Sequence, residues 1–256
     1  SLPNTMTKPG DNTTAENQRL RDQYLEVSEL AGALAHEIKN PLSVIRMNMD
    51  LLAEDFGEAE NQRERRFLQK IHIVQSQCLR LQNLLDDFLR FIRVSKIDLK
   101  AGSLNEQIQR VLDFVAPKAT DKKIEIYPSL DADLPTILMD APRLYAALLN
   151  LVLNAIESLQ ATGGSIWVHS RRTAAGVALD LIDNGCGMDR DTSIHVFEPF
   201  YTTKENGSGL GLPTARRIIE AHGGRIAVRS DEGRGTWFTL EFPMPPRLTS
   251  DEPASD

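Results

Sequence analysis

The sequence predicts a protein in two parts: a helical hairpin that pairs with a second copy into a four-helix bundle, followed by an α/β sandwich. The first observation is a pair of long runs, between residues 16 and 98, whose apolar residues recur at helical spacing. The second is a change near Lys100, beyond which short β-branched stretches alternate with helical ones. The third is size, because 256 residues with 41% hydrophobic residues suffice for two cores.

Each run of the first part carries one apolar stripe. The stripes advance in steps of four and three residues, as in a coiled coil or bundle, and the segment "FGEAENQR" separates them. One hairpin covers such stripes only in part, so we expect a homodimer. The stripe residues are Ala31, Leu34, Ile38, Leu42, Ile45, Met49, Leu52 and Phe56, then Phe67, Ile71, Val74, Cys78, Leu81, Leu85, Phe88 and Ile92.

The second part begins with a helix that Ser103 caps and Glu106 completes as a capping box. A second, very apolar helix follows, with a proline in its first turn. Helices on one side of a mostly antiparallel sheet are the natural packing for these elements. We expect helices over 104–119 and 141–159, and strands over 122–128, 136–140, 165–172, 176–184, 224–230 and 235–243.

These elements divide the chain into segments. We expect a disordered linker over 1–15, the hairpin over 16–98, a hinge over 99–103, the sandwich over 104–244 and a disordered tail over 245–256. The chain starts at Ser1, and both ends are polar, so we expect it to be a piece of a longer protein.

Composition excludes several classes of function. A net charge of -7 argues against nucleic-acid binding, which needs clustered Lys and Arg. Two distant cysteines, Cys78 and Cys186, indicate neither a disulfide framework nor a zinc site and fit the reducing cytoplasm. The longest apolar stretch, residues 144–156, is too short for a membrane span, so we expect no direct membrane insertion.

The stretch "HEIKNPL" sets a histidine on the outer face of the first helix. On a helical projection His36 lies opposite the apolar stripe, with Glu37 beside it and Asn40 one turn further on. A neutral imidazole is a nucleophile, and an adjacent carboxylate can take or hold its proton, so His36 is a candidate phosphoryl acceptor. The alternative is an ordinary surface histidine, with Pro41 as a packing kink.

The second part carries a pair of asparagines and an acidic glycine box. Asn150 and Asn154 share one face of an apolar helix, so at least one of them should face a polar cavity, where an amide oxygen can bind Mg²⁺. Asp183 ends a strand before Gly185 and Gly187, where a carboxylate can accept from an adenine amino group. The alternatives are satisfied core amides and a hairpin turn.

A glycine-rich segment leads into the next helix. Gly207, Gly209 and Gly211 precede it, so its free N–H groups and its dipole favour a phosphate. The spacing is neither that of a Walker A loop nor that of a Rossmann fingerprint. Lys204 lies in the preceding segment "YTTKENGS", which is either a lid that offers this lysine to phosphates or an ordinary loop.

These motifs, taken in order, resemble the cytoplasmic core of two-component sensor histidine kinases. "HEIKNPL", "NLVLNA", "DNGCGM", "FEPFYTTK", "GSGLGL" and "GTWFTLEF" match the family's six boxes over about residues 25–243. The resemblance implies a HisKA phosphoacceptor domain and a Bergerat-type ATP-binding sandwich of the GHKL class. It also implies a sensor region, outside this chain, that can be membrane-bound.

The resemblance also implies roles for particular residues. His36 would accept the phosphoryl group, Glu37 would act as its acid/base partner, and Asn40 would align water for dephosphorylating the partner. Asn154 would ligate Mg²⁺, and Asp183 would read the adenine with support from Thr236. The remaining nucleotide-binding positions would be Asn150, Gly185, Gly187, Met188, Lys204, Gly207, Ser208, Gly209, Leu210 and Gly211.

The expected activity is therefore ATP-dependent autophosphorylation on His36, then transfer to an aspartate of a response-regulator receiver domain. Phosphatase activity toward that regulator is also expected. One alternative is an ATPase of the same superfold, but such enzymes place a glutamate base where this chain has Asn150. Another is a degenerate, non-catalytic dimeric scaffold. We expect Pro41 to loosen the helix next to His36 and act as a hinge.

Overall fold

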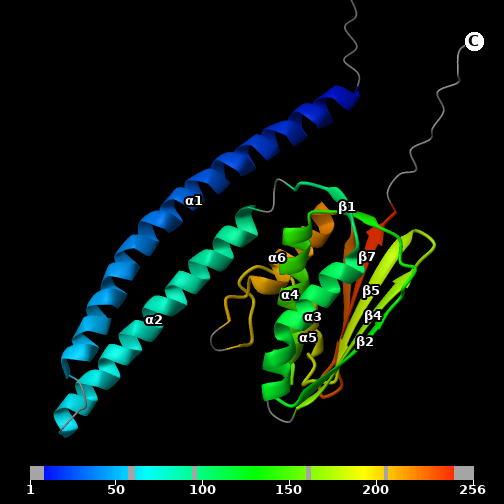
Figure 1. Ribbon diagram of the computed structural model, residues 1–256. Helices are drawn as coiled ribbons and strands as arrows, with labels where there is room; N and C mark the ends of the chain where they lie inside the picture. Colours follow the sequence, from blue (N-terminus) through cyan, green and yellow to red (C-terminus); the bar gives the residue numbers. More distant parts are fainter. Residues whose placement is uncertain (1–8, 57–60, 94–96, 160–162, 205–206, 245–256) are drawn as a thin grey trace, which may run out of the picture. The chain divides into compact units, whose positions relative to one another are not determined.

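The computed structural model describes residues 9–56, 61–93, 97–159, 163–204 and 207–244. The chain divides into two compact units, residues 1–95 and 96–256, and each is treated by itself (Figure 1). The tail expected over 245–256 and the first half of the linker expected over 1–15 lie outside the described residues.

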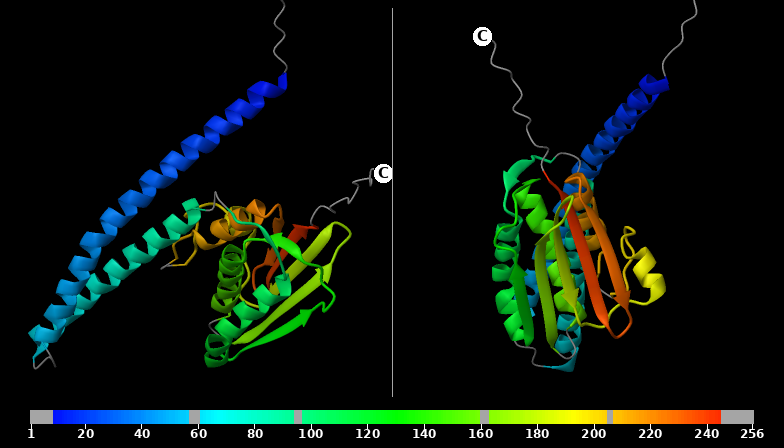
Figure 2. Two further views of the ribbon diagram at one scale, coloured as in Figure 1. Left: turned by 45° about the horizontal axis from the view of Figure 1, so that its top comes forward. Right: turned by 90° about the vertical axis from the view of Figure 1, so that its right-hand side faces the viewer.

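The first unit is a hairpin of two long helices, α1 (Pro9–Phe56) and α2 (Gln62–Ile92), which lie side by side (Figures 1 and 2). Asn61 caps α2, because its side-chain oxygen accepts from the backbone N–H groups of Arg63 and Glu64, each at 3.0 Å. The helix α1 starts at Pro9, earlier than the expected start near residue 16. A proline is well tolerated in a first turn, and the polar residues after it do not stop a helix.

The apolar stripes of this hairpin are only partly covered. Leu42, Ile71, Cys78 and Ile92 are buried, whereas Ile38 and Ile45 on α1 remain 46% and 42% exposed. The stripe residues Leu34, Leu52, Phe67, Val74 and Leu81 are exposed as well. Two helices bury only the sides that face each other, which leaves the rest of each stripe exposed.

Polar contacts tie the two helices together beside the stripe. Lys39 on α1 forms an ion pair with Asp86 on α2. Further toward the turn, Gln75 Nε2 donates to Asp50 Oδ1 at 2.7 Å, and Gln82 Nε2 donates to Ser43 Oγ at 3.1 Å. The two glutamine contacts are exposed and the Lys39–Asp86 pair is half-buried, so these contacts set the register of the two helices more than their stability.

The second unit is built around a five-stranded sheet in the order β2-β4-β5-β7-β6. The pair β2–β4 is parallel and the other pairs are antiparallel. Figure 1 shows α3, α4 and α6 over one face of the sheet, and the right view of Figure 2 shows the strands from the other side. The strands are β2 (Ile124–Leu130), β4 (Gly164–Arg172), β5 (Gly176–Asp183), β6 (Arg225–Asp231) and β7 (Gly235–Pro243).

Three helices of this unit supply one side of its core: α3 (Leu104–Asp121), α4 (Ala141–Ser158) and α6 (Gly211–Ala221). The short α5 (Arg190–His195) has no buried residue. Ser103 caps α3, accepting from the N–H of Glu106 at 3.3 Å as expected. The core lies between the helices and the sheet, where Leu104, Leu144, Ile166 and Leu240 are fully buried.

One segment differs from its expectation. Part of the hinge expected over 99–103 is a strand, β1 (Lys100–Gly102), which pairs antiparallel with β3 (Ile137–Met139). The reason is that the short β3 lies outside the large sheet, and its backbone N–H and C=O groups need a partner strand. Contacts across β1–β3 therefore attach this part of the segment to the second unit.

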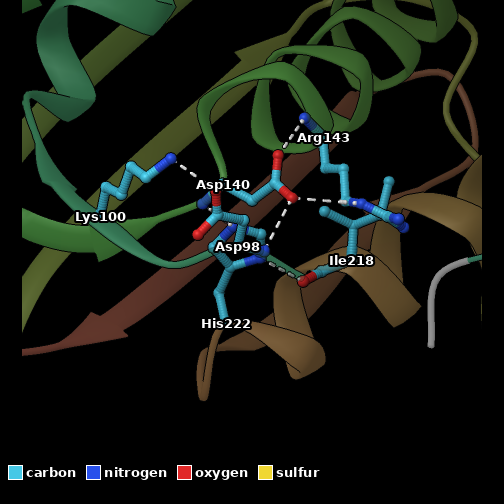
Figure 3. A network of polar contacts seen from close by, with 6 residues as sticks. All are labelled: Asp98, Lys100, Asp140, Arg143, Ile218 and His222. Atoms are coloured by element: carbon cyan, nitrogen blue, oxygen red, sulfur yellow. Dashed lines mark hydrogen bonds and ion pairs between the residues drawn. The ribbon is translucent and has the colours of Figure 1, made fainter. Parts of the chain in front are cut away.

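A polar network fastens the same region (Figure 3). Asp140 caps α4 through the N–H of Arg143 at 3.2 Å, and its other oxygen accepts from the backbone N–H of Asp98 at 3.1 Å. The backbone N–H of Asp140 in turn donates to His222, the residue that ends α6. The network thus joins Asp98, just before β1, to the start of α4 and the end of α6.

Among the described residues, none of the helices is long and apolar enough to cross a membrane.

Candidate functional site

The second unit holds a cavity of about 720 Å³ beside α4. The end of β5, the segment that leads into α6 and the start of β7 complete its walls. The predicted residues that line it are Asn154, Asp183, Gly187, Met188, Lys204, Gly207, Ser208, Gly209, Gly211 and Thr236. Asn150, Gly185 and Leu210 lie next to it, outside the lining found among the described residues.

Asp183, the last residue of β5, lines this cavity. It is only 4% exposed, and its Oδ1 accepts from Ser158 Oγ at 3.0 Å and from the N–H of Gly185 at 2.9 Å. Burial raises the pKa of the Asp183 carboxyl, against the opposing effect of hydrogen bonds from Gly185, Ser158 and the backbone of Thr236. Thr236 lies directly opposite Asp183 in the β5–β7 pairing. The Asp183 carboxylate is therefore a hydrogen-bond acceptor that Ser158 and Gly185 keep in position at the cavity wall.

The glycines near Asp183 are required mainly by the fold around them. Gly187 has a φ of 65°, and a Cβ there would lie 2.0 Å from the backbone oxygen of Asp231. At Gly185 a Cβ would lie 2.1 Å from Ser158 Oγ, the hydroxyl that holds Asp183. Neighbouring protein atoms therefore exclude a side chain at both glycines, whether or not a ligand approaches the backbone there.

The start of α6 forms another wall. Gly211, Leu212 and Pro213 line the cavity with the first turn of this helix. The N-cap residue is Leu210, which is fully buried and has no polar side chain to satisfy the first N–H groups. Asn150 Nδ2 donates to the carbonyl oxygen of Gly211 at 3.3 Å, which fixes the start of α6 against α4. Such a helix end favours an anionic group such as a phosphate.

Lys204 closes the polar side of the cavity. Its ammonium donates to Asn154 Oδ1 at 2.8 Å and to Glu157 Oε2 at 2.5 Å. Asn154 and Glu157 are three residues apart on α4, so both side chains face the cavity. The amide oxygen of Asn154 therefore already lies in a place that attracts a cation.

Sequence reasoning missed part of the lining. Ser158, which holds Asp183, was not named, although it follows Asn154 by four residues and the helical period places both on one face. Sequence reasoning assigns no role to Glu157, and the structure brings it to Lys204, 47 residues away. Cys186, an exposed thiol in the cavity wall, had no signal beyond its place between Gly185 and Gly187.

The predicted acceptor residues lie in the other unit, on α1. His36, Glu37 and Asn40 are all exposed, while Ala35 is 1% and Leu42 is 8% exposed on the side that faces α2. The helix continues through Pro41. Across the described residues, His, Cys, Asp and Glu side chains form no group of three or more that could hold a metal ion.

Comparison with known proteins matches each of the two units to a family model. Residues 26–97 match the model of the His Kinase A (phospho-acceptor) domain, and residues 139–246 match that of the histidine kinase-, DNA gyrase B- and HSP90-like ATPase. The sensor histidine kinase ZraS of Escherichia coli (strain K12) is 34% identical over 232 residues, which cover 90% of this chain and 48% of that protein. The chain belongs to the sensor histidine kinase family.

Similar solved structures agree with this assignment, among them the histidine kinase ThkA. The catalytic domain of ThkA is 32% identical, with a TM-score of 0.53, over 59% of this chain and all of that one. Full-length ShkA in complex with AMPPNP is 29% identical, with a TM-score of 0.67, over 84% of this chain and 45% of that one. ThkA in complex with the response regulator TrrA is 25% identical, with a TM-score of 0.65, over 96% of this chain and 69% of that one.

The expected hairpin followed by a GHKL-type α/β sandwich is confirmed by these matches. The family's second domain is an ATP-binding domain, and the cavity beside α4 lies in the part of the chain that matches it. The chain spans about half the length of the E. coli ZraS that it matches.

Proposed function

We propose that this histidine kinase core binds ATP in the second unit, phosphorylates His36 and passes the phosphoryl group to an aspartate of a response-regulator receiver domain. The observation that carries the proposal is the cavity itself. It joins a buried carboxylate, Asp183, to the open N-terminus of α6 and to the ammonium of Lys204. One end suits an adenine amino group and the other suits a polyphosphate.

Each part of the nucleotide has a suitable place. Asp183 accepts from the adenine amino group, and the bonds from Ser158 and Gly185 keep its Oδ1 in position. The N–H groups at the start of α6 and the segment 207–211 bind the phosphates. The glycines, Ser208, Leu210 and Met188 shape this wall, and Asn150 fixes it to α4. Lys204 balances phosphate charge.

Asn154 is the proposed Mg²⁺ ligand. Its amide oxygen points into the cavity and already contacts an ammonium, so the residues present suit a cation. Mg²⁺ bound there with the nucleotide would neutralise charge on the phosphates during transfer. The chain's own part is to orient the nucleotide with Asn154, Asp183 and the start of α6.

His36 and Glu37 supply the acceptor. A ring nitrogen of His36 attacks the γ-phosphorus of ATP, so that an N–P bond forms while the O–P bond to the β-phosphate breaks and ADP leaves. Glu37 takes or holds the proton of the other ring nitrogen. Both side chains are exposed, as an acceptor that must meet a nucleotide and then a second protein requires.

The second transfer is to a partner. An aspartate oxygen of a receiver domain attacks the phosphoryl group, and the N–P bond at His36 breaks. The solved complex of ThkA with its response regulator TrrA, which matches 96% of this chain, supports a partner of this class. Asn40, one turn from His36 and equally exposed, is the proposed residue that aligns water for dephosphorylating the regulator.

We propose that the working unit is a homodimer in which the exposed stripes of two hairpins meet. Ile38 and Ile45 form part of the apolar surface that a second copy would cover.

The two cysteines fit a place in the cytoplasm, where ATP is available. Cys78 and Cys186 form no disulfide with each other, as the reducing cytoplasm requires.

Incubation of the chain with Mg²⁺ and γ-labelled ATP tests the proposal. We expect label on the chain that is stable to alkali and lost in acid, none on His36→Gln, and transfer to an added receiver domain. Rapid ATP hydrolysis without such label would favour an ATPase, although Asn150 replaces the glutamate base of that class. Neither label nor hydrolysis would favour the non-catalytic scaffold.

A further inference from the structure

The contact between Lys204, Asn154 and Glu157 is a cation bound by two oxygens. Lys204 Nζ lies 2.8 Å from Asn154 Oδ1 and 2.5 Å from Glu157 Oε2. The side chains of Lys204 and Glu157 are 46% and 35% exposed, so water screens the pair. A contact of this kind is held weakly enough to exchange for another cation.

The oxygens in question suit a divalent ion. One amide oxygen and one carboxylate oxygen, one turn apart on α4, are hard ligands of the kind that Mg²⁺ prefers. The ammonium of Lys204 carries one positive charge to the same two atoms. Because two cations at one pair of oxygens repel each other, a bound Mg²⁺ and Lys204 compete for Asn154 and Glu157.

The carboxylate also acts on the nucleotide. Glu157 lines the same cavity as the start of α6, where the phosphates of the proposed nucleotide would lie. Without a cation between them, the carboxylate and the phosphates repel. A lysine held at Glu157 offsets part of this repulsion but is itself withheld from the phosphates. Metal-free ATP therefore meets either an unpaired carboxylate or an occupied lysine, and both oppose its binding.

We propose that Asn154 and Glu157 form a cation-binding site that the Lys204 ammonium occupies until Mg²⁺ enters with the nucleotide. Nucleotide binding therefore depends on Mg²⁺. The inference rests on the proposed ATP site and adds Glu157 to it as a second oxygen ligand of the cation. On entry of Mg²⁺, the Lys204 ammonium leaves both oxygens and becomes free to contact the phosphates. No covalent bond forms or breaks in this exchange.

The test measures binding of a fluorescent adenine nucleotide to the full chain, first in EDTA and then across a Mg²⁺ titration. The variants are Glu157→Gln, Lys204→Met and the double variant. Two matched controls, Lys118→Met on α3 and Glu220→Gln on α6, remove the same charges from residues outside the cavity lining.

Three results are expected. Glu157→Gln binds the nucleotide in EDTA roughly tenfold more tightly than the unchanged chain, because a charge-assisted contact and a repulsion both disappear. Lys204→Met reaches half-maximal binding at a lower Mg²⁺ concentration, because the competitor is gone. The double variant needs roughly tenfold more Mg²⁺ than Lys204→Met, because the carboxylate that attracts Mg²⁺ is gone. The controls match the unchanged chain.

Two results overturn the inference while leaving the proposed function intact. One is an unchanged Mg²⁺ midpoint in Lys204→Met, and the other is the same midpoint in the single and double variants. In either case Lys204 and Glu157 form an ordinary surface ion pair. Failure of the unchanged chain to bind the nucleotide at any Mg²⁺ concentration overturns the proposed function itself.

Discussion

His222 accepts a hydrogen bond from the backbone N–H of Asp140 across 82 residues of sequence (Figure 3). The distance is 2.9 Å and His222 is 4% exposed. Because Nε2 accepts, Nδ1 carries the proton and donates to the carbonyl oxygen of Ile218 at 2.6 Å. The neutral ring therefore joins the end of α6 to the start of α4, the two helices that contribute to the cavity wall.

Removing this acceptor should weaken the second unit. His222→Phe retains an aromatic ring but leaves the N–H of Asp140 buried without a partner, which costs about 1–3 kcal/mol. Urea unfolding of the full chain measures the loss. His222→Gln retains a side-chain acceptor and should lose less. Equal losses in the two variants would mean that ring packing against Phe242, rather than the hydrogen bond, matters.

The buried carboxylate of Asp183 should leave a mark on pH dependence. Burial raises its pKa in the folded chain above the unfolded value, so its contribution to stability is complete below the unfolded pKa and is lost as pH rises through the folded one. In the Asp183→Asn variant, residue 183 makes no pH-dependent contribution to stability. We compare the free energy of unfolding of each chain with its own value at about pH 4. Between about pH 4 and pH 7 this free energy should fall further in the unchanged chain than in the variant.

Nucleotide binding gives the matching functional result. Asp183→Asn should bind ATP at least roughly tenfold more weakly, because the charged acceptor is lost. A variant that binds ATP normally would contradict the place given to adenine. Parallel stability curves for variant and unchanged chain would contradict the raised pKa.

The two cysteines allow nucleotide binding to be measured by thiol labelling. Cys186 is exposed and lines the cavity, whereas Cys78 is 5% exposed between α1 and α2. A maleimide should label Cys186 first, and Mg-ATP should slow that labelling at least roughly tenfold when the site is saturated. Mass spectrometry of the digested chain separates the two sites. Labelling of Cys186 at the same rate with and without nucleotide would argue against nucleotide binding in this cavity.

A charge on the exposed stripe should break the proposed dimer. Ile45→Glu removes an apolar contact from both copies, about 3 kcal/mol or more per dimer, so the dissociation constant should rise at least roughly hundredfold. Sedimentation over a concentration series measures it. Met47→Glu is the matched control, since Met47 is 57% exposed and lies outside the stripe. Equal effects at the two positions would place the dimer contact elsewhere.

Pro41 lies five residues after His36, inside α1. Pro41→Ala should restore the hydrogen bond to the carbonyl of Glu37 and stabilise the helix by up to about 3 kcal/mol. If the loosened turn serves as a hinge, the ratio of His36 phosphorylation to regulator dephosphorylation should change as well. Pro117→Ala in α3 is the control for a helical proline away from His36. A stiffer helix with an unchanged ratio would leave Pro41 as a packing feature.

Local signals were sufficient for much of the fold. The Ser103 cap, the apolar stripes of α1 and α2 and the alternating strands were predictable because each depends on residues within a few positions of one another. The β1–β3 pair was not, since neither three-residue strand carries a pattern of its own. The same holds for the parallel β2–β4 pair, whose direction depends on the path of α4 between the strands.

By itself, the sequence determined the two-part organisation, the outward face of His36 and many of the residues that line the cavity, because helical period and motif spacing are short-range properties. Only the tertiary structure decided that Lys204 meets Asn154 and Glu157, that Ser158 holds Asp183, and that His222 joins α6 to Asp140. These partners lie 25 to 82 residues apart. What brings them together is the packing of α4 and α6 on the sheet, and local spacing carries no information about that packing.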